Sequence, residues 1–135
     1  MGLPNLPFAY YTASRQLISG LHINKITDLL TSYMGKITAL AGGAQAGSPV
    51  LNGAFIDIST VATGADSVQL PVSQLGLRVC VTNDGANSAQ IFGNINEPLS
   101  YIQGTIGTTG VALASGATAL FICTKANTWK RFVSA

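Results

Sequence analysis

A period-two alternation of apolar and polar residues, repeated in short segments from residue 54 onwards, is the strongest constraint on how this chain folds. In 77–83, for example, Leu77, Val79 and Val81 alternate with Arg78 and Cys80. Such alternation is typical of strands that bury one face. Gly, Asn, Ser or Pro turns separate the segments at intervals of about 8 to 12 residues, as in all-β domains. We therefore predict a mostly β fold, an antiparallel β-sandwich of jelly-roll type, with strands in 54–60, 67–71, 77–83, 88–93, 110–116, 117–125 and 128–135.

The dipeptide Asp84-Gly85 separates the strands predicted in 77–83 and 88–93. Asp-Gly between two alternating runs is a strong signal for a tight turn with antiparallel partners. We therefore expect these two strands to form a β-hairpin that serves as scaffold.

The segment 117–125 is apolar on both faces of the predicted strand. Ala119, Phe121 and Cys123 face one way, while Leu120 and Ile122 face the other. A strand without a polar face lies in the middle of a packed structure or at an interface.

The first 53 residues have a different composition and predict three further segments. Residues 1–20 contain Pro4 and Pro7 and are expected to form an extended N-terminal arm. Residues 21–41 are the one segment with helical spacing, and 42–53 is a Gly/Ala-rich stretch expected to be a flexible linker. The β-sandwich domain would then comprise 54–135.

The predicted helix carries a seam of apolar residues at alternating spacings of three and four. A seam of this kind favours a coiled coil, and isoleucine at its core positions favours trimers. A helix packed on its own domain has the same spacing, so both arrangements remain open. The residues predicted for an oligomer seam are Ile23, Ile26, Leu30, Tyr33 and Ile37.

The composition indicates that something other than water covers much of the surface. Hydrophobic residues make up 47 % of the chain and charged residues only 9 %, where an ordinary domain has about 25 % charged residues. No window of about 18 residues is free of polar, Gly or Pro interruptions, so we expect no membrane span. The first 16 residues lack the basic and apolar regions of a secretory signal.

The charges are few and scattered, with seven Lys/Arg against five Asp/Glu. A nucleic-acid-binding domain gathers its basic residues on one face, so we expect no nucleic-acid partner. Folding could still bring Arg78 together with Lys130 and Arg131.

The two cysteines, Cys80 and Cys123, lie in strongly apolar predicted strands. In a chain without an export signal, buried free thiols are the favoured state, and a disulfide is the alternative. Two cysteines and one histidine do not provide a zinc site, and we expect no cofactor.

The residues that carry acid–base or nucleophilic catalysis are sparse. His22 is the only histidine, it lies at the start of the predicted helix, and nothing near it completes a catalytic triad. Asp57 is unusual because it lies within an apolar strand, where it either faces solvent or joins a buried network. The loop 104–110, GTIGTTG, lacks the Lys-Ser/Thr of a phosphate loop and is expected to be flexible. We therefore predict that the protein is not an enzyme.

The order of several segments resembles a β-domain that recurs in virion structural proteins of tailed bacteriophages, including small capsid cement and decoration proteins. The segments are ADSVQLP (65–71), LGLRVCVTNDGANSAQIFG (75–93), SGATALFICT (115–124) and TWKRF (128–132). LISGLHINKITDLLTSY (17–33) is similar to the short helical lead before this domain. The chain departs from the pattern at 94–110, where a longer loop with a proline replaces a compact one.

The resemblance implies a non-enzymatic shell component on the capsid surface of a virion, made in the host cytoplasm. On this hypothesis the chain binds across junctions of the major capsid protein as an oligomer, expected to be a homotrimer. The extended arm would supply the capsid contacts, through Leu3, Leu6, Phe8, Tyr10 and Tyr11.

The alternative function is a tail-fibre or baseplate module that binds a host surface glycan. Its stacking surface would use Tyr101 and Trp129 with the loop 94–110. An enzyme of unrecognised type, such as a small hydrolase, has the least support because the chain has so few residues suited to catalysis.

Overall fold

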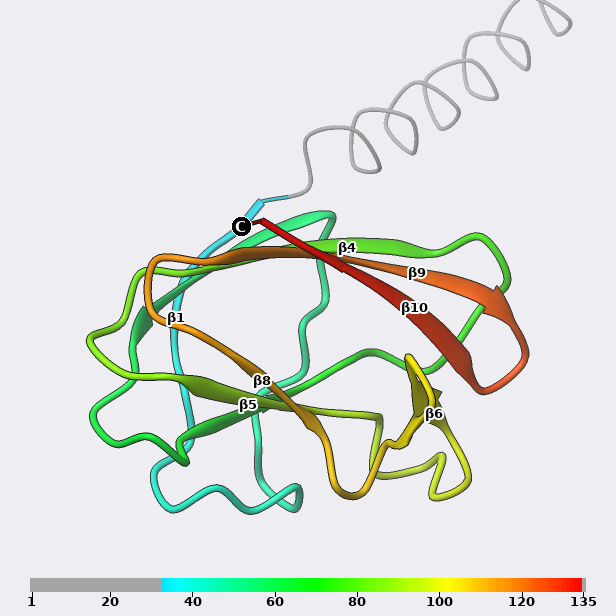
Figure 1. The fold of residues 1–135 in the computed structure, drawn as a ribbon, viewed down its shortest axis with the longest axis horizontal. Coiled ribbons are helices and arrows are strands. Elements are labelled where there is room, and N and C mark those ends of the chain that lie inside the picture. Colours follow the sequence, from blue (N-terminus) through cyan, green and yellow to red (C-terminus); the bar gives the residue numbers. More distant parts are fainter. Residues whose placement is uncertain (1–32, 135) are drawn as a thin grey trace, which may run out of the picture. The chain divides into compact units, whose positions relative to one another are not determined.

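The computed structural model describes residues 33–134, which form two β-sheets and no helix (Figure 1). The mostly β prediction is confirmed. The strands are β1 (Tyr33–Thr38), β2 (Phe55–Thr60), β3 (Ser67–Gln69), β4 (Arg78–Asn83), β5 (Ala89–Phe92), β6 (Tyr101–Ile102), β7 (Thr105–Ile106), β8 (Val111–Leu113), β9 (Thr118–Lys125) and β10 (Thr128–Val133).

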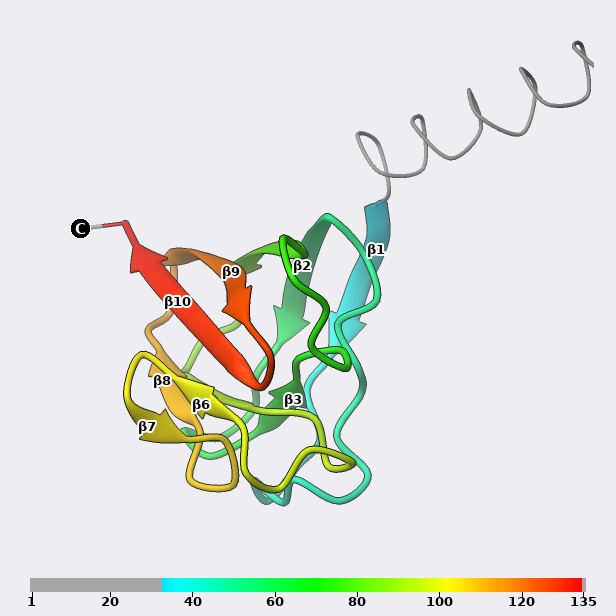
Figure 2. The same ribbon diagram turned by 90° about the vertical axis from the view of Figure 1, so that its right-hand side faces the viewer.

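The larger sheet has seven strands in the order β1-β2-β4-β9-β10-β6-β7, and the smaller has three in the order β3-β5-β8. In Figure 1, β4, β9 and β10 lie on one side of the domain, while β5 and β8 lie on the other. Figure 2 shows the β6–β7 hairpin next to β10 and close to β8. The two sheets therefore enclose a common interior.

The expectation of a purely antiparallel jelly roll is wrong, because the pairing is mixed. The pairs β1–β2, β2–β4, β3–β5 and β6–β10 are parallel. Parallel neighbours need a crossover, and in the pairs β2–β4 and β3–β5 the crossover is a strand of the opposite sheet. The chain runs from β2 to β3, returns to β4 and crosses again to β5, so successive turns of this winding stack in the same direction.

The core lies between the inward faces of the two sheets. The predicted alternation is confirmed in β2, where Ile56 and Ile58 are buried, and in β4, where Val79 and Val81 are buried. In β9 the face with Ala119, Phe121 and Cys123 turns inward, while Leu120 and Ile122 are only partly buried. The largest fully buried side chains are Trp129, Phe121, Leu51, Ile56, Ile58 and Leu70.

Both sides of the larger sheet are joined to the smaller one by backbone hydrogen bonds. Beyond β1, Leu40 and Ser67 form an antiparallel bridge to β3. Beyond β7, the Gly93 N–H donates to the carbonyl of Gly107 at 2.9 Å, next to the end of β5. These links satisfy backbone groups that would otherwise remain open at sheet edges.

The predicted hairpin of 77–83 with 88–93 is wrong, because β4 and β5 belong to different sheets. Asn83, which is fully buried, directs the crossing. Its side-chain amide donates to the carbonyls of Asn87 and Leu113, and its Oδ1 accepts from the Gly85 N–H at 3.0 Å. The Asp84-Gly85 turn therefore carries the chain between the sheets rather than back along one sheet.

The predicted helix 21–41 cannot extend past Ser32, because Tyr33–Thr38 is strand β1. Gly35 has φ 78°, which is incompatible with a right-handed helix, and β1 pairs with β2 over its length. Tertiary pairing outweighs the helical spacing of Ile37 and Leu40. The rest of that prediction, residues 21–32, and the arm 1–20 lie outside the described residues.

The segment 42–53, predicted as a flexible linker, is instead packed into the domain. Leu51 is fully buried in the core, and Val50 forms a bridge to Gln69. The buried Ser48 hydroxyl lies 2.7 Å from the Ser67 hydroxyl and donates to the carbonyl of Ala44. Polar side chains compensate for the lack of a regular strand, so the β-domain begins at Tyr33 rather than at residue 54.

The carboxylate of Asp66 ties this segment to the loop between β2 and β3. One oxygen accepts from the N–H groups of Ala62 (2.7 Å) and Thr63 (3.0 Å). The other accepts from the Thr63 hydroxyl (2.6 Å) and the Gly42 N–H (3.3 Å). These donors favour the charged form and lower the pKa of Asp66 from its ordinary value of 3.8.

We predict that Gly85→Ala lowers the free energy of unfolding by about 2 kcal/mol or more. A β-carbon at this position would lie 2.6 Å from the Val61 nitrogen and 2.7 Å from its side chain, in a fully packed interior. Gly64→Ala is the matched control, because a β-carbon there meets nothing within 4 Å. Equal urea midpoints for the two variants would contradict this account of the crossing.

We predict that Asp66→Asn lowers the melting temperature at pH 7 and flattens the pH dependence of stability in the acid range. Because the folded-state pKa lies below 3.8, the ionised carboxylate stabilises the domain above the unfolded pKa. This contribution is lost as the pH falls from about 4 through the folded-state pKa. Thermal unfolding from pH 7 to pH 2 measures it, with the exposed Asp84→Asn as control; identical curves for the two variants would refute the role of Asp66.

Candidate functional site

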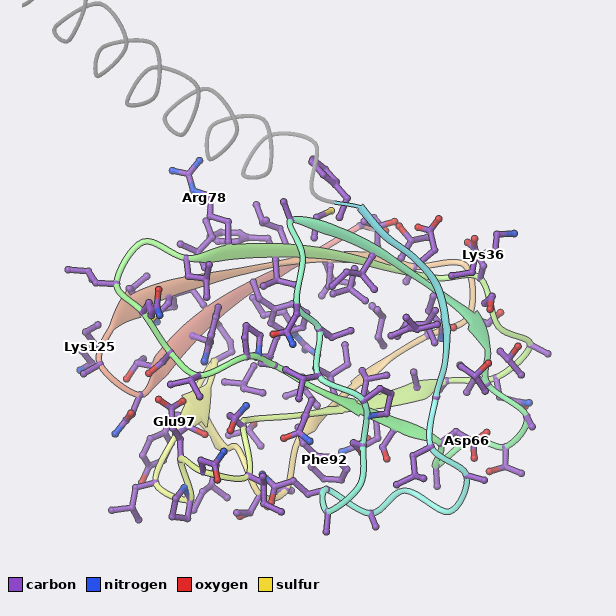
Figure 3. The ribbon with its side chains drawn as sticks, turned by 180° about the vertical axis from the view of Figure 1, so that it is seen from behind. Lys36, Asp66, Arg78, Phe92, Glu97 and Lys125 are labelled. Carbon is purple, nitrogen blue, oxygen red and sulfur yellow. The ribbon has the colours of Figure 1, made fainter. Side chains whose placement is uncertain are left out.

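Three loops meet at one end of the domain and form what we call the loop platform, residues 70–77, 93–100 and 126–127. The first joins β3 to β4, the second joins β5 to β6, and the third is the β9–β10 turn. Figure 3 shows Glu97 and Lys125, from the second loop and from the end of β9, at the same end of the molecule.

Ser73 and Glu97 bind the three loops to one another. The Glu97 carboxylate accepts from the Ser73 N–H at 3.0 Å and from the Ser73 hydroxyl at 2.7 Å. The Ser73 oxygen also accepts from the Asn127 N–H at 3.0 Å. Hydrogen bonds to a charged acceptor are about twice as strong as neutral ones, so this clamp fixes the loops relative to one another.

The second loop is also fixed to the body of the domain by two buried amides. The Asn94 side chain donates to the carbonyl of Leu70 at 3.1 Å, and its Oδ1 accepts from the Asn96 N–H at 3.0 Å. The Gln69 Oε1 accepts from the Ile95 N–H at 3.0 Å. The platform is therefore ordered although it has almost no regular secondary structure.

The platform is unusually apolar for an exposed surface. Leu75 is 78 % exposed and Leu99 is 70 % exposed. Among the described residues, five of the eight exposed large hydrophobic side chains lie on these loops or directly after them, at Val72, Leu75, Ile95, Leu99 and Tyr101. Apolar side chains gathered on a rigid surface indicate a site for binding another molecule.

The one carboxylate of the platform, that of Glu97, is engaged within the clamp. It accepts three hydrogen bonds from Ser73. Within residues 33–134, no group of three His, Cys, Asp or Glu side chains is placed to hold a metal ion. Over the same residues, no helix is long and apolar enough to cross a membrane.

The predicted aromatic pair Tyr101 and Trp129 does not form a stacking surface. Tyr101 is 44 % exposed beside the platform, but Trp129 is fully buried in the core. The two positions are adjacent, since Thr128 pairs with Tyr101 and Trp129 with Ile102, but β10 turns the Trp129 ring inward. Phe132, three residues later, lies on the opposite face and is 60 % exposed.

The predicted oligomer seam is corrected at two of its five positions. Tyr33 and Ile37 lie on β1 rather than on a helix, and Ile37 packs against the core. The remaining seam residues Ile23, Ile26 and Leu30 lie outside the described residues. So do His22 and the arm residues Leu3, Leu6, Phe8, Tyr10 and Tyr11.

The two cysteines lie on opposite faces of the larger sheet and are free thiols, so the alternative of a disulfide between them within one chain is wrong. Cys80 is partly buried on the outer face, opposite Leu120, whereas Cys123 is buried on the inner face. Burial raises the pKa of both thiols, and the charge of Asp57 adds to this effect at Cys80.

The loop 104–110, predicted to be flexible, packs against the domain at Gly107 and Gly110. A β-carbon at Gly107 would collide with the Ser100 hydroxyl and lie 3.1 Å from the Gly93 α-carbon. Gly110 has φ 69° and lies against Ile91 and Phe92, where a β-carbon would meet both within 2.8 Å. These glycines allow the β6–β7 hairpin to approach the end of β5.

The sequence pointed to one part of the platform, the loop 94–110, but as a glycan surface, and it did not indicate the apolar surface shared by the three loops. Val72, Leu75, Ile95 and Leu99 lie outside every period-two segment. The available signal was the presence of large apolar residues beside Pro71, Gly76 and Pro98, where polar turn residues are the norm.

Comparisons with models of known protein families, with curated proteins and with solved structures found no match to this chain.

We predict that Glu97→Ala increases amide hydrogen exchange at Ser73 and Asn127 by about tenfold or more. The substitution removes the charged acceptor, and hydrogen bonds to charged groups contribute about 1.5–3 kcal/mol. Exchange measured residue by residue by NMR is the test, with Asp84→Ala as the control for loss of one exposed carboxylate. Unchanged exchange over 70–77 in Glu97→Ala would show that other contacts hold the platform.

Proposed function

We propose that this chain is a non-enzymatic structural protein of a phage virion, a capsid cement or decoration protein that binds across major capsid protein junctions. The observation that carries the proposal is the rigid apolar platform, with Leu75 and Leu99 as its most exposed members. The phage assignment comes from the resemblance of 65–71, 75–93, 115–124 and 128–132 to virion β-domains.

The platform suits a partner that is itself a folded protein surface. Binding costs less when the contacting loops are already ordered, and the Ser73–Glu97 clamp supplies that order. Apolar side chains at the centre with few charges are typical of the buried part of protein interfaces. The sparse charge of the whole chain, 9 %, agrees with a surface that neighbouring proteins cover.

Cementing follows from mass action. A protein that binds only the assembled shell stabilises it by RT ln(1 + [L]/Kd), which is about 2.7 kcal/mol at a concentration of one hundred times Kd. Linking two or more copies raises the effective concentration of the second contact and hence the avidity. We therefore propose that the chain acts as an oligomer on the outer surface of the capsid, after synthesis in the host cytoplasm.

The helical seam supports a homotrimer less strongly than the sequence alone suggested. With Tyr33 and Ile37 in β1, the seam retains Ile23, Ile26 and Leu30, which span fewer than two heptads. Helices of fewer than about 12–15 residues are marginal in water. The expected homotrimer therefore needs contacts from the described domain as well.

The glycan-binding alternative has weaker support. Recognition of a sugar by stacking needs exposed aromatic faces, and the burial of Trp129 leaves Tyr101 without its proposed partner. The aliphatic residues of the platform offer neither stacking nor hydrogen bonds to a sugar.

We predict that Leu75→Asp with Leu99→Asp lowers binding to shells assembled without this chain by at least tenfold. Each substitution places a charge where an apolar contact forms, while both side chains are exposed in the free protein and the fold is retained. Co-sedimentation with the shells measures the affinity, and Thr60→Asp, also exposed but at the other end of the domain, is the matched control. Equal binding by wild type and both variants would show that the platform is not the contact.

A further inference from the structure

We propose that the outer face of the larger sheet is a self-association surface, on which a second copy of this chain packs face to face. This surface is separate from the loop platform. Its role does not depend on what the platform binds.

A continuous row of apolar side chains, which we call the apolar row, crosses four neighbouring strands on this face. Phe55 of β2 pairs with Cys80 of β4, Cys80 pairs with Leu120 of β9, and Leu120 pairs with Phe132 of β10. Phe55 is 53 % exposed and Phe132 is 60 % exposed, while Cys80 and Leu120 are partly buried. At about 4.8 Å between strands, the apolar row extends about 14 Å.

A sheet that packs on one face usually carries polar side chains on the other, but the outer face of this sheet is apolar. Leu120 and Ile122 are not part of the core cluster, which β9 meets through its other face. A strand that is apolar on both faces at the centre of a sheet is normally covered on both sides. The described residues cover only the inner side, so the outer side is suited to a partner.

The two sides of the apolar row differ in charge. Nearer the loop platform, Arg78, Ile122 and Lys130 lie in register across β4, β9 and β10. Figure 3 shows Arg78 pointing away from the domain. On the other side, Asp57 and Thr82 lie in register with each other.

This asymmetry selects one way of pairing two copies. A twofold axis along the apolar row places the row of one copy on the row of the other and sets the Arg78 side against the Asp57 side. An axis along the strands would instead bring the Arg78 and Lys130 sides of both copies together, where like charges repel. Exposed Lys36 lies beside Asp57 on the outermost strand β1 and is the remaining charge on that side.

The size of the face sets the strength of the pairing. Three residue rows across four strands cover about 14 Å by 14 Å, well below the roughly 800 Å² per partner of stable complexes. We therefore expect a weak pair that forms at micromolar or higher concentration in solution. In this pair the loop platforms of the two copies point in opposite directions, so both platforms stay accessible.

Sedimentation velocity of the full chain over a range of concentrations tests the proposal. We expect a concentration-dependent shift to larger species in the wild type, and at least a tenfold weaker association for Phe55→Ser with Phe132→Ser. Leu75→Ser with Leu99→Ser is the matched control, since it removes two even more exposed apolar residues from the platform. Association that is unchanged in the first variant, or lost equally in both, would overturn the proposal.

Charge reversal tests the orientation. Arg78→Glu is expected to weaken the association at least threefold, because it places an acid opposite Asp57. A stronger association would show that the Arg78 sides face each other and would overturn the proposed axis.

Cys80 provides an independent probe that needs no substitution at the interface. Its alkylation by a maleimide, followed by peptide mass spectrometry, should slow as the protein concentration rises through the association range. Buried Cys123 serves as the internal reference for folding. A Cys80 rate that is the same at all concentrations would overturn the proposal even if the aromatic variants failed to fold, and it would leave the platform proposal untouched.

Discussion

The crossing of the chain from β4 to β5 is the constraint on which the rest of the structure depends. Because β2 and β4 lie in one sheet and β3 and β5 in the other, the chain must pass between layers after each of these four strands. The passage after β4 is buried, and Asn83 supplies the hydrogen bonds that water would otherwise provide. Gly85 allows the turn to press against Val61 without a side chain in the way.

Because successive turns of the chain stack on one another, their loops lie at the same end of the domain. The connection from β3 to β4 and that from β5 to β6 come to the same end, where the β9–β10 turn joins them. Ser73, Glu97 and Asn127 are far apart in the sequence and are brought into contact only by the stacking of successive turns. The apolar side chains that these loops expose are therefore presented on an ordered surface.

The sequence predicted the strands better than their partners. Alternation placed β2, β4, β9 and β10 within a few residues, since burial on one face is a local pattern. Strand pairing, in contrast, depends on residues far apart in the sequence. Asp84-Gly85 is typical of a hairpin turn, yet the buried hydrogen bonds of Asn83 direct the chain into the other sheet. The segment 42–53 looks like a linker because its packing depends on partners such as Ser67 and Gln69. Tyr33 and Ile37 fit a helix by spacing, but pairing with β2 determines their conformation.

The two apolar surfaces divide the proposed work between them. The platform would contact the shell, and the outer face of the larger sheet would pair two copies whose platforms point in opposite directions. Both are made of side chains whose exposure in a single copy is energetically unfavourable at roughly 25 cal/mol per Å². Assembly would remove this cost, which agrees with a protein that functions only when surrounded by neighbours.

The most direct test is electron microscopy of the source particles labelled with Fab fragments raised against this chain. A capsid cement protein predicts Fab density over the shell faces at regular spacing. Label confined to the tail, or absent from intact particles, would contradict the account.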